Sequence, residues 1–161
     1  MARWASYLNE GLSRYHRTRN NAANRGGVSG MSPWLHHGMV AATRLVRDAA
    51  EHGTKGAEKF LDEMLVFREH AYHHAHDVDR PYAWDHVPDW ARASWRNTAL
   101  VHPARPAMDL ERAQSNDVLW NAAQRGVVRH GVMHNNVRMT WGKGTVQWME
   151  DPEAAMRLTQ D

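Results

Sequence analysis

Hydrophobic positions recur every three or four residues along most of the chain, which is the spacing of amphipathic helices. Near the N-terminus this spacing occurs at Trp4, Tyr7, Leu8, Leu12 and Tyr15. It predicts a first helix that ends in the Asn- and Gly-rich stretch beyond it. The sequence contains no alternating strand pattern and no internal repeat, so it predicts an all-α protein.

Start and stop signals divide the rest of the chain into further helices. Ser32 followed by Pro33 predicts a helix start, because a hydroxyl can cap a helix and proline suits its first position. A broad apolar stripe predicts a buried helix from Ala57 to His76. A loop rich in Pro, Asp and aromatic residues follows. Further helices are predicted over 43–52, 89–100, 109–115, 118–130, 134–149 and 152–160.

Length and composition favour one domain over residues 1–161. A chain of 161 residues can bury a real core, and because it contains no cysteine it cannot form a disulfide framework. No apolar run reaches membrane-spanning length, and the N-terminus lacks a signal-peptide pattern. We therefore expect a soluble, cytoplasmic protein without a membrane partner, and we expect it to be a monomer.

The small net charge of +2 is unevenly distributed along the chain. Residues 1–25 contain five arginines and one glutamate, whereas residues 51–95 contain nine acidic and five basic residues. A basic first helix could contact phosphate groups, but a solvated amphipathic face has the same composition. Charge alone therefore leaves nucleic-acid binding open.

Histidines are frequent, and four of them lie close together at His70, His73, His74 and His76. The pair His70 and His74 has the spacing for a shared metal ion on a helix. The zinc motif of metalloproteases also requires a glutamate after the first histidine, and Ala71 occupies that position. A helix end that runs into a polar loop explains the cluster more simply, so we expect no metal site.

The segment 117–148 contains an unusual density of aromatic and polar side chains. Trp141 and Trp148 are seven residues apart, so on a helix they share one face. An adjoining face combines an amide, a guanidinium, a thioether and a glycine, contributed by Asn135, Arg138, Met139 and Gly142. Any one tryptophan is most simply a core residue with its N–H satisfied. The mixed face, however, is typical of the wall of a binding site.

Four sequence blocks identify a family resemblance that covers nearly the whole chain. The segment 117–148 contains DVLWNAAQR, MHNNVRM, TWGK and Trp148, and upstream lie SRYHRTRNN (13–21), VSGMSPWLHHGMV (28–40) and KFLDEMLVFREHAYHH (59–74). In this order the blocks resemble the cryptochrome/photolyase family, and most closely the class II cyclobutane pyrimidine dimer photolyases. The resemblance implies a helical FAD-binding domain of photolyase type.

The resemblance also implies an activity, a cofactor and a partner. Enzymes of this kind are deoxyribodipyrimidine photo-lyases, in which light drives an electron from reduced FAD into a pyrimidine dimer flipped out of DNA. A flavin needs hydrogen-bond donors near its ring, a cradle for its pyrophosphate and a dry pocket, while the cofactor itself carries the redox chemistry. We therefore expect FAD as cofactor and dimer-containing DNA as partner.

Motif position assigns the site residues. The cofactor would contact Tyr15, Ser29, Met31, Ser32, Arg68, Asn135 and Arg138. The dimer would be hydrogen-bonded by Glu63 and contacted by Arg19, Asn20, Phe67 and Met139. Electrons would reach the flavin through Trp141, Trp120 and Trp148. Simpler roles are open for some of them, since Ser32 could only cap a helix and Arg68 could only form a surface ion pair.

The sequence departs from the family pattern in several places. Phe67 occupies a position where the family usually has tryptophan, His37 replaces a phenylalanine, and Gly144 replaces a lysine. The 161 residues do not include the family's N-terminal α/β antenna domain or the segment that closes its flavin pocket. We therefore expect either a fragment of a longer protein or a reduced relative.

Three functions remain compatible with the sequence. The first is a light-driven DNA repair lyase, or its truncated flavin domain. The second is a cryptochrome-like flavin photoreceptor, which would keep the flavin site and the tryptophans without repairing dimers. The third is a cofactor-free helical remnant that binds nucleic acid through its basic first helix. Glu63, Arg19 and Asn20 favour repair over photoreception.

Overall fold

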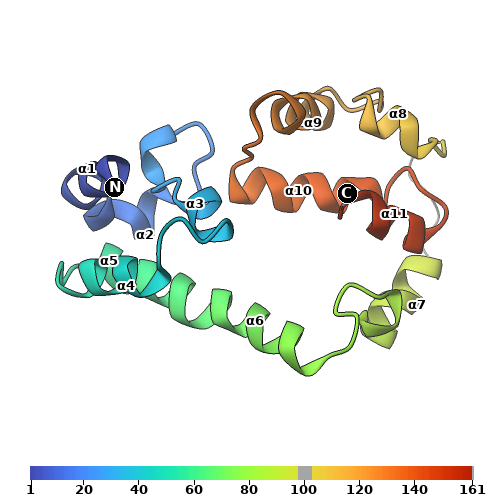
Figure 1. Cartoon of the computed structure of the whole chain (residues 1–161). Helices are drawn as coiled ribbons and strands as arrows, with labels where there is room; N and C mark the ends of the chain where they lie inside the picture. The colour runs from blue at the N-terminus through green and yellow to red at the C-terminus, as the bar shows by residue number, and fades with distance from the viewer. Residues whose placement is uncertain (98–102, 161) are drawn as a thin grey trace. The chain divides into compact units, whose positions relative to one another are not determined.

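The computed structural model describes residues 1–97 and 103–160, and every regular element among them is helical (Figure 1). This confirms the all-α prediction for the described residues. The chain divides into two compact units, Met1–Pro81 and Tyr82–Asp161, which are described separately below. The end of the predicted helix 89–100 and the start of the link after it lie outside the described residues. The single domain over residues 1–161 stays a prediction.

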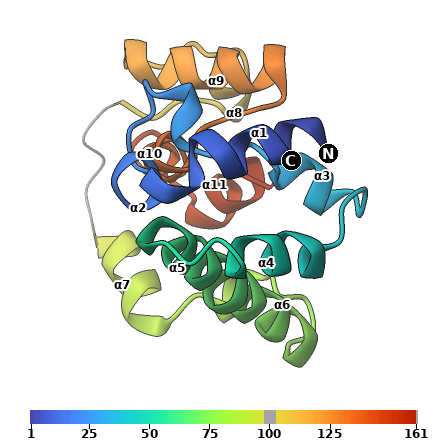
Figure 2. The ribbon, with the colours of Figure 1, turned by 90° about the vertical axis from the view of Figure 1, so that its left-hand side faces the viewer.

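The first unit is built from short helices around one aromatic core. In chain order they are α1 (Ala2–Glu10), η1 (Leu12–Arg14), α2 (Tyr15–Thr18), η2 (Arg25–Gly27), α3 (Ser32–His36), α4 (Ala42–Ala50), α5 (Lys55–Asp62), η3 (Glu63–Phe67) and α6 (Arg68–Asp77). Antiparallel neighbours α4 and α5 pack side by side (Figure 2). The core contains Trp4, Tyr7, Leu12, Met31, Leu45, Ala49, Ala57, Phe60 and Met64.

The predicted first helix is interrupted at Gly11. Helix α1 ends there, and the Gly11 N–H donates to the Tyr7 carbonyl at 2.9 Å. A Cβ at position 11 would lie 2.4 Å from the Tyr7 ring, so only glycine allows this close approach. The apolar spacing continues across the break, because η1 and α2 still direct Leu12 and Tyr15 toward the core.

The predicted helix 57–76 exists, but a π-turn divides it. Helix α5 begins after Thr54, whose hydroxyl accepts a hydrogen bond from the Ala57 N–H, and it continues through the π-turn η3 into α6 without a break (Figure 1). Burial is confirmed only for the first half. Helix α6 has no buried residue, because its sequence is rich in histidine and charged side chains.

The second unit has its own core around two tryptophans. Its elements are η4 (Trp84–His86), α7 (Asp89–Asn97), α8 (Ala107–Glu111), α9 (Val118–His130), α10 (Asn135–Thr145) and α11 (Pro152–Leu158). The core contains Leu110, Trp120, Trp148, Met149 and Ala155. Helix α9 has strong end signals, since the Asp117 carboxylate accepts from the Leu119 and Trp120 N–H groups and Gly131 adopts a left-handed conformation.

Helix α10 is shorter than the sequence predicts. It ends at Thr145, so Trp148 lies in the turn that follows and not on the helix. Two glycines and the β-branched Thr145 occupy its last turn, and the Thr145 hydroxyl donates to the Gly142 carbonyl at 2.8 Å. Such side-chain bonds compete with helix continuation. Among the described residues, no helix is long and apolar enough to cross a membrane.

Gly56 provides a test of the packing in the first unit. A Cβ at this position in α5 would lie 1.9 Å from the Leu12 carbonyl oxygen, which belongs to the backbone of η1. Alanine normally stabilises a helix interior by about 1 kcal/mol relative to glycine. The overlap is larger than a helix can absorb, so we expect Gly56→Ala to lower the free energy of unfolding by about 2 kcal/mol or more, measured by urea unfolding.

The matched control is Gly126 in α9, where an added Cβ would meet no atom within 4 Å. We expect Gly126→Ala to raise the free energy of unfolding by up to about 1 kcal/mol. If Gly56→Ala were as stabilising as Gly126→Ala, the close contact between α5 and η1 would be wrong.

Candidate functional site

The residues assigned from the sequence fall into both units and form separate groups in each. The first unit contains Tyr15, Arg19, Asn20, Ser29, Met31, Ser32, Glu63, Phe67 and Arg68, and the second contains Trp120, Asn135, Arg138, Met139, Trp141 and Trp148. Each group is described within its own unit, so the cofactor site as a whole stays a prediction.

Glu63 is the centre of a group of charged side chains that we call the Glu63 cluster: Tyr15, Arg19, Lys59 and Glu63. Arg19 Nη2 and Lys59 Nζ lie 2.5 Å and 2.9 Å from the same Glu63 oxygen, Oε1. The Arg19 guanidinium also lies 5.8 Å from the centre of the Tyr15 ring. Residues that are 44 positions apart in the sequence are therefore in direct contact.

The Glu63 cluster holds its cations in the charged form. The pKa of the Lys59 ammonium is raised above its ordinary value by its hydrogen bonds to Asp62 and Glu63. Burial raises the pKa of the Tyr15 hydroxyl, although the nearby Arg19 acts in the opposite direction. At neutral pH the cluster therefore presents a neutral phenol beside two cations.

Two further residues assigned to the substrate side border this cluster. Asn20 accepts a hydrogen bond from Arg19 Nη1 at 3.3 Å. The Phe67 side chain is 60% exposed, and its ring centre lies 5.3 Å from Lys59 Nζ. An exposed aromatic ring beside a cation is available for stacking. The sequence-based assignments of Arg19, Asn20, Glu63 and Phe67 therefore coincide with one surface region of the first unit.

The π-turn explains how Glu63 and Phe67 come to lie on the same side as Lys59. In a regular α-helix each residue advances by roughly 100°, so positions eight apart diverge by roughly 80°. A π-turn has more residues per turn, which reduces this divergence over Glu63–Phe67. Such turns are frequent at functional sites.

The loop that contains Ser29 and Ser32 precedes helix α3. The Ser29 hydroxyl accepts a hydrogen bond from the Met31 N–H at 3.3 Å, and Gly30 between them has a left-handed conformation with φ of 64°. Ser32 is the first residue of α3, and Met31 occupies the N-cap position without a side-chain capping hydrogen bond. The helix start predicted at Ser32–Pro33 is confirmed, and a cofactor contact by Ser32 stays a prediction.

Met31 and Arg68 are both engaged within the first unit. The Met31 side chain is only 3% exposed and belongs to the core. Arg68 forms an ion pair with Glu69, and its Nη2 donates to the Tyr72 hydroxyl at 3.1 Å. The structure thus contains the surface ion pair that was the alternative for Arg68. Cofactor contacts by either residue stay predictions.

Three tryptophans form a continuous chain of rings in the second unit. The Trp141 and Trp120 rings are stacked at 13° with centres 6.0 Å apart, and the Trp120 and Trp148 rings meet edge to face at 5.4 Å. Trp120 Nε1 donates to the Trp141 carbonyl at 2.8 Å, and Trp141 Nε1 donates to Gln124 Oε1 at 2.9 Å. The rings meet in the order in which the resemblance places the electron relay.

Gly144 is required for this arrangement. A Cβ at position 144 would lie 2.5 Å from Trp120 Cδ1 and 3.3 Å from Trp148 Cζ3. The departure from the family lysine at this position therefore has a physical consequence. Glycine lets both indole rings approach the backbone of α10.

A cleft of about 720 Å3 lies next to the tryptophans, in the size range of small-molecule sites. Its lining is largely apolar and consists of Leu110, Glu111, Trp120, Gln124, Val127, Val128, Met133, Arg138, Trp141, Leu158, Thr159 and Gln160. Arg138 is the one cation among these lining residues. Its Nη2 donates to Asn135 Oδ1 at 2.7 Å, so the predicted neighbours on α10 do lie together.

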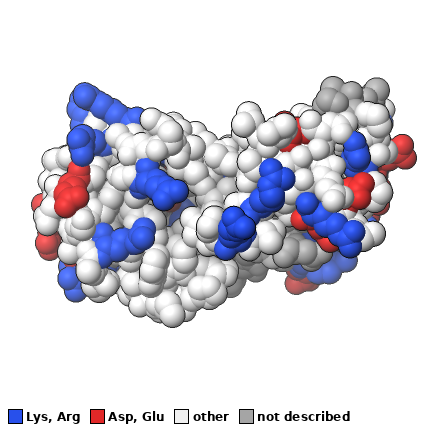
Figure 3. All heavy atoms as spheres, turned by 90° about the horizontal axis from the view of Figure 1, so that it is seen from above, with Lys and Arg blue, Asp and Glu red and all other residues white. Residues whose placement is uncertain are grey.

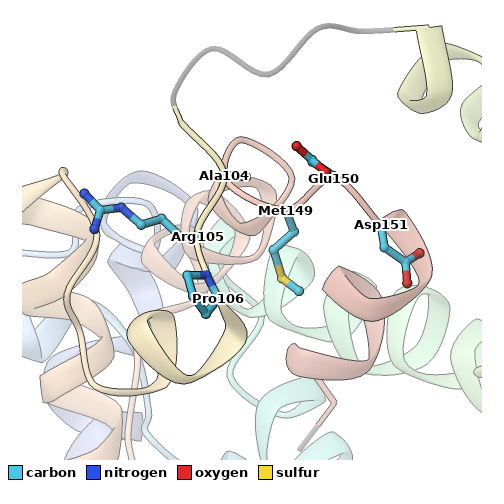
Figure 4. Close-up of a pocket in the computed structure, with 6 residues that line it drawn as sticks. All are labelled: Ala104, Arg105, Pro106, Met149, Glu150 and Asp151. Atoms are coloured by element: carbon cyan, nitrogen blue, oxygen red, sulfur yellow. The ribbon is translucent and has the colours of Figure 1, made fainter.

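A second, smaller pocket of about 370 Å3 does not have the character of a reaction site. It is bordered by Ala104, Arg105, Pro106, Met149, Glu150 and Asp151. The Arg105 side chain points away from Glu150 and Asp151 (Figure 4). The charged groups therefore do not converge on one point.

Each unit on its own contains side chains that suit one part of a flavin dinucleotide. A guanidinium at an aromatic-walled cleft suits the oxygen-bearing edge of a flavin ring, and serine hydroxyls suit a pyrophosphate. By contrast, residues 1–97 and 103–160 contain no group of three or more metal-ligating side chains arranged around one point. His73 and His76 instead contact Asp77 at 3.2 Å and 3.1 Å.

Charge does not outline a nucleic-acid footprint by itself. Lys and Arg side chains on the face seen from above form separate groups divided by uncharged residues (Figure 3). In the basic N-terminal region, Arg14 donates to the Glu10 carbonyl at 2.8 Å and Arg19 pairs with Glu63. The charge pattern of this face therefore does not identify a nucleic-acid surface.

Comparison with known proteins gives one consistent answer. A deoxyribodipyrimidine photo-lyase from Methanothermobacter thermautotrophicus is 34% identical over 158 residues, which is 94% of this chain and 34% of that protein. Those from Arabidopsis thaliana and Potorous tridactylus are each 32% identical over 95% of this chain. The chain belongs to the photolyase family. No family model matches it.

The match to these photolyases covers only part of their length. The chain spans about a third of the relatives that it matches, between 30% and 34% of the three named above. What the whole enzymes do therefore applies to this chain only as a proposal. The family resemblance and the all-helical fold inferred from the sequence are confirmed.

Sequence reasoning missed two residues at these sites. Lys59 lies one turn before Glu63, and the spacing of oppositely charged residues at i and i+4 could have identified it. Gln124 binds the Trp141 indole from a different helix, α9. No signal in the sequence indicated that contact, because it depends on how α9 and α10 pack.

The tryptophan chain can be tested through Gly144. We expect Gly144→Ala to displace the Trp120 and Trp148 rings, because neither ring can keep its place beside an added Cβ. The circular dichroism signal from coupled indoles should fall, and the free energy of unfolding should decrease by about 1–3 kcal/mol. Gly142→Ala is the matched control, since a Cβ there meets no atom within 4 Å. Equal spectra for the two variants would contradict the assigned contact.

Proposed function

We propose that this chain is the flavin- and DNA-binding helical part of a class II-type photolyase, which repairs pyrimidine dimers by light-driven electron transfer. The observation that carries the proposal is the chain of three tryptophan rings beside the cleft that Arg138 lines. Membership of the photolyase family supports it. Repair by the chain alone, FAD as its cofactor and damaged DNA as its substrate are parts of this proposal.

Bound FAD would supply the light absorption and the redox chemistry. The hydroxyls of Ser29 and Ser32 would donate to its pyrophosphate, and Arg138 would bind the oxygen-bearing edge of its ring. Asn135 would keep the Arg138 guanidinium in place through their 2.7 Å hydrogen bond. The apolar walls of the cleft would exclude water from the ring.

The tryptophans would deliver electrons to the cofactor. Trp141 would lose one electron to the photoexcited flavin and recover it from Trp120, which would in turn be refilled from Trp148. The two transfers between tryptophans would cross ring contacts of 6.0 Å and 5.4 Å between centres. Because Trp148 is only 1% exposed, a one-electron reductant in solution would return the electron to it by transfer through the protein and not by direct contact.

The Glu63 cluster would recognise the dimer. Glu63 would accept a hydrogen bond from a ring N–H of a pyrimidine, and Phe67 would stack on the base. Arg19, Asn20 and Met139 would complete the substrate side. The close pairing of Arg19 with Glu63 supports repair over a purely photoreceptive function, because that function requires the tryptophans but not this cluster.

A cryptochrome-like photoreceptor and a cofactor-free remnant are the alternatives. The tryptophan chain supports both flavin functions equally. The remnant is supported by the packing roles of Met31 and Trp148, which are 3% and 1% exposed. Flavin binding separates the first two functions from the third. The cytoplasmic location and the monomeric state also stay predictions.

Flavin binding is the first test of the proposal. After incubation with excess FAD and gel filtration, we expect the protein to retain flavin absorption bands. Arg138→Gln should weaken FAD affinity by roughly tenfold or more, because hydrogen bonds to charged groups contribute about 1.5–3 kcal/mol. Ser29→Ala should have a smaller effect, of about threefold.

Arg129→Gln serves as the control, since Arg129 is an exposed residue of α9 that does not line the cleft. Its FAD affinity should equal that of the parent protein. A protein that retains no flavin under any of these conditions would exclude both flavin functions and favour the cofactor-free remnant.

Photoreduction tests the tryptophan chain. Replacing Trp141, Trp120 or Trp148 with Phe keeps most of the apolar volume, so a packing role predicts mainly a stability loss of about 1–3 kcal/mol. Because phenylalanine is much harder to oxidise than tryptophan, a relay predicts that blue-light reduction of bound FAD is nearly lost in each variant. FAD occupancy should stay near that of the parent.

The position of each ring predicts a different kinetic result. Loss of Trp141 should abolish the first transfer, whereas loss of Trp148 should leave a short-lived charge separation that recombines. Transient absorption spectroscopy distinguishes the two. Photoreduction at the parent's rate in all three variants would mean that the tryptophans only pack.

A further inference from the structure

The Glu63 carboxylate is held in an unsymmetrical way. Both of its cationic partners, Arg19 and Lys59, contact Oε1. The Glu63 side chain is 25% exposed, so an approaching ligand can reach it. The two cations therefore hold the carboxylate through the same oxygen, and the carboxylate remains accessible to a donor on a ligand.

Lys59 is the residue that joins this carboxylate to the exposed ring. Its ammonium binds Glu63 Oε1 at 2.9 Å, forms an ion pair with Asp62 and lies 5.3 Å from the centre of the Phe67 ring. These contacts connect three consecutive turns of α5 and η3 along one side. Lys59 is also only 32% exposed, because its stem lies along the helix.

We propose that Lys59 is a positioning residue for pyrimidine recognition, which together with Arg19 fixes Glu63 so that its carboxylate accepts a hydrogen bond from a base N–H. The proposal rests on the proposed function, because it deepens the recognition of a dimer by the Glu63 cluster. Lys59 acts through Glu63 and does not itself contact the base.

The alternative role for Lys59 is a direct contact with a DNA phosphate. The geometry is against it, because two carboxylates already share the ammonium and compete with any phosphate. A phosphate contact and a positioning role predict that the DNA affinity depends differently on salt concentration and on the presence of the dimer. A direct contact contributes equally to damaged and undamaged strands, and it adds about 0.7 to the slope of log affinity against log salt concentration on a single strand.

Binding of a labelled single-stranded oligothymidylate, with or without one cyclobutane thymine dimer, tests the proposal by fluorescence anisotropy. We expect the parent protein to prefer the strand with the dimer. Lys59→Met should reduce that preference by roughly tenfold, the size of one well-placed hydrogen bond, and leave the salt slope unchanged. Lys59→Arg, which keeps the charge, should restore part of it.

Two comparisons make the result specific to Lys59. Lys55→Met removes an exposed lysine one turn earlier in α5 and should bind both strands like the parent. The double variant Lys59→Met with Glu63→Gln should lose no more preference than Glu63→Gln alone, because both changes remove one function. Additive losses, or an equal loss for both strands with a flatter salt slope, would overturn the proposal.

A measurement without DNA separates this proposal from the proposed function. The chain contains only three lysines, Lys55, Lys59 and Lys143, so 15N NMR of the ammonium groups is simple to assign. The Lys59 signal should be slow to exchange in the parent and should broaden in Glu63→Gln. If it is unchanged in Glu63→Gln, Asp62 alone holds Lys59 and the positioning role is wrong. If it broadens but the parent shows no preference for the dimer, the contact stands and the dimer recognition fails.

Discussion

The contact between Gly56 and the backbone of Leu12 controls the geometry of the first unit. An added Cβ at position 56 would lie 1.9 Å from the Leu12 carbonyl oxygen, so the two segments approach as closely as polypeptide backbones can. This approach fixes how η1 and α2 lie against α5 and η3. It places Tyr15 and Arg19, which follow Leu12, beside Lys59 and Glu63, which follow Gly56. The close contact of Gly56 with the Leu12 backbone therefore brings the residues of the Glu63 cluster together.

The second unit uses the same principle with aromatic partners. The absence of a side chain at Gly144 lets two indoles approach the backbone of α10 from different segments. The Trp120 ring then stacks on Trp141 and meets the edge of Trp148. In each unit a helical glycine gives up about 1 kcal/mol of helix propensity to permit close packing. Of the side chains assigned to function, Trp120 and Trp148 lie directly against Gly144.

The sequence predicted most helices because their periodic apolar spacing and end signals are local. Thr54, Asp117 and Gly131 are examples, since each ends or begins its helix through contacts within a few residues. The break at Gly11, the π-turn and the early end of α10 depend instead on side-chain packing or on competing hydrogen bonds. Spacing rules do not contain that information.

The sequence predicted some residues of the candidate site but not others. Motif resemblance selected Arg19 and Glu63 although they are 44 residues apart, and the structure brings them into contact. It also gave the order of the three tryptophans. The contact of Gln124 with Trp141 depends on tertiary packing, which no spacing in the sequence encodes.

The π-turn at Glu63–Phe67 links the direction of the Phe67 side chain to the number of residues in this helix. Such a turn accommodates one residue more than an α-helical turn of the same rise. Deletion of one residue there would restore a regular α-helix and leave Phe67 seven positions after Lys59, within roughly 20° of the same side. In a regular α-helix of the present length, the eight positions between the two residues would separate their directions by roughly 80°. The wider turn therefore lets the helix contain this many residues and still keep the Phe67 ring beside Lys59.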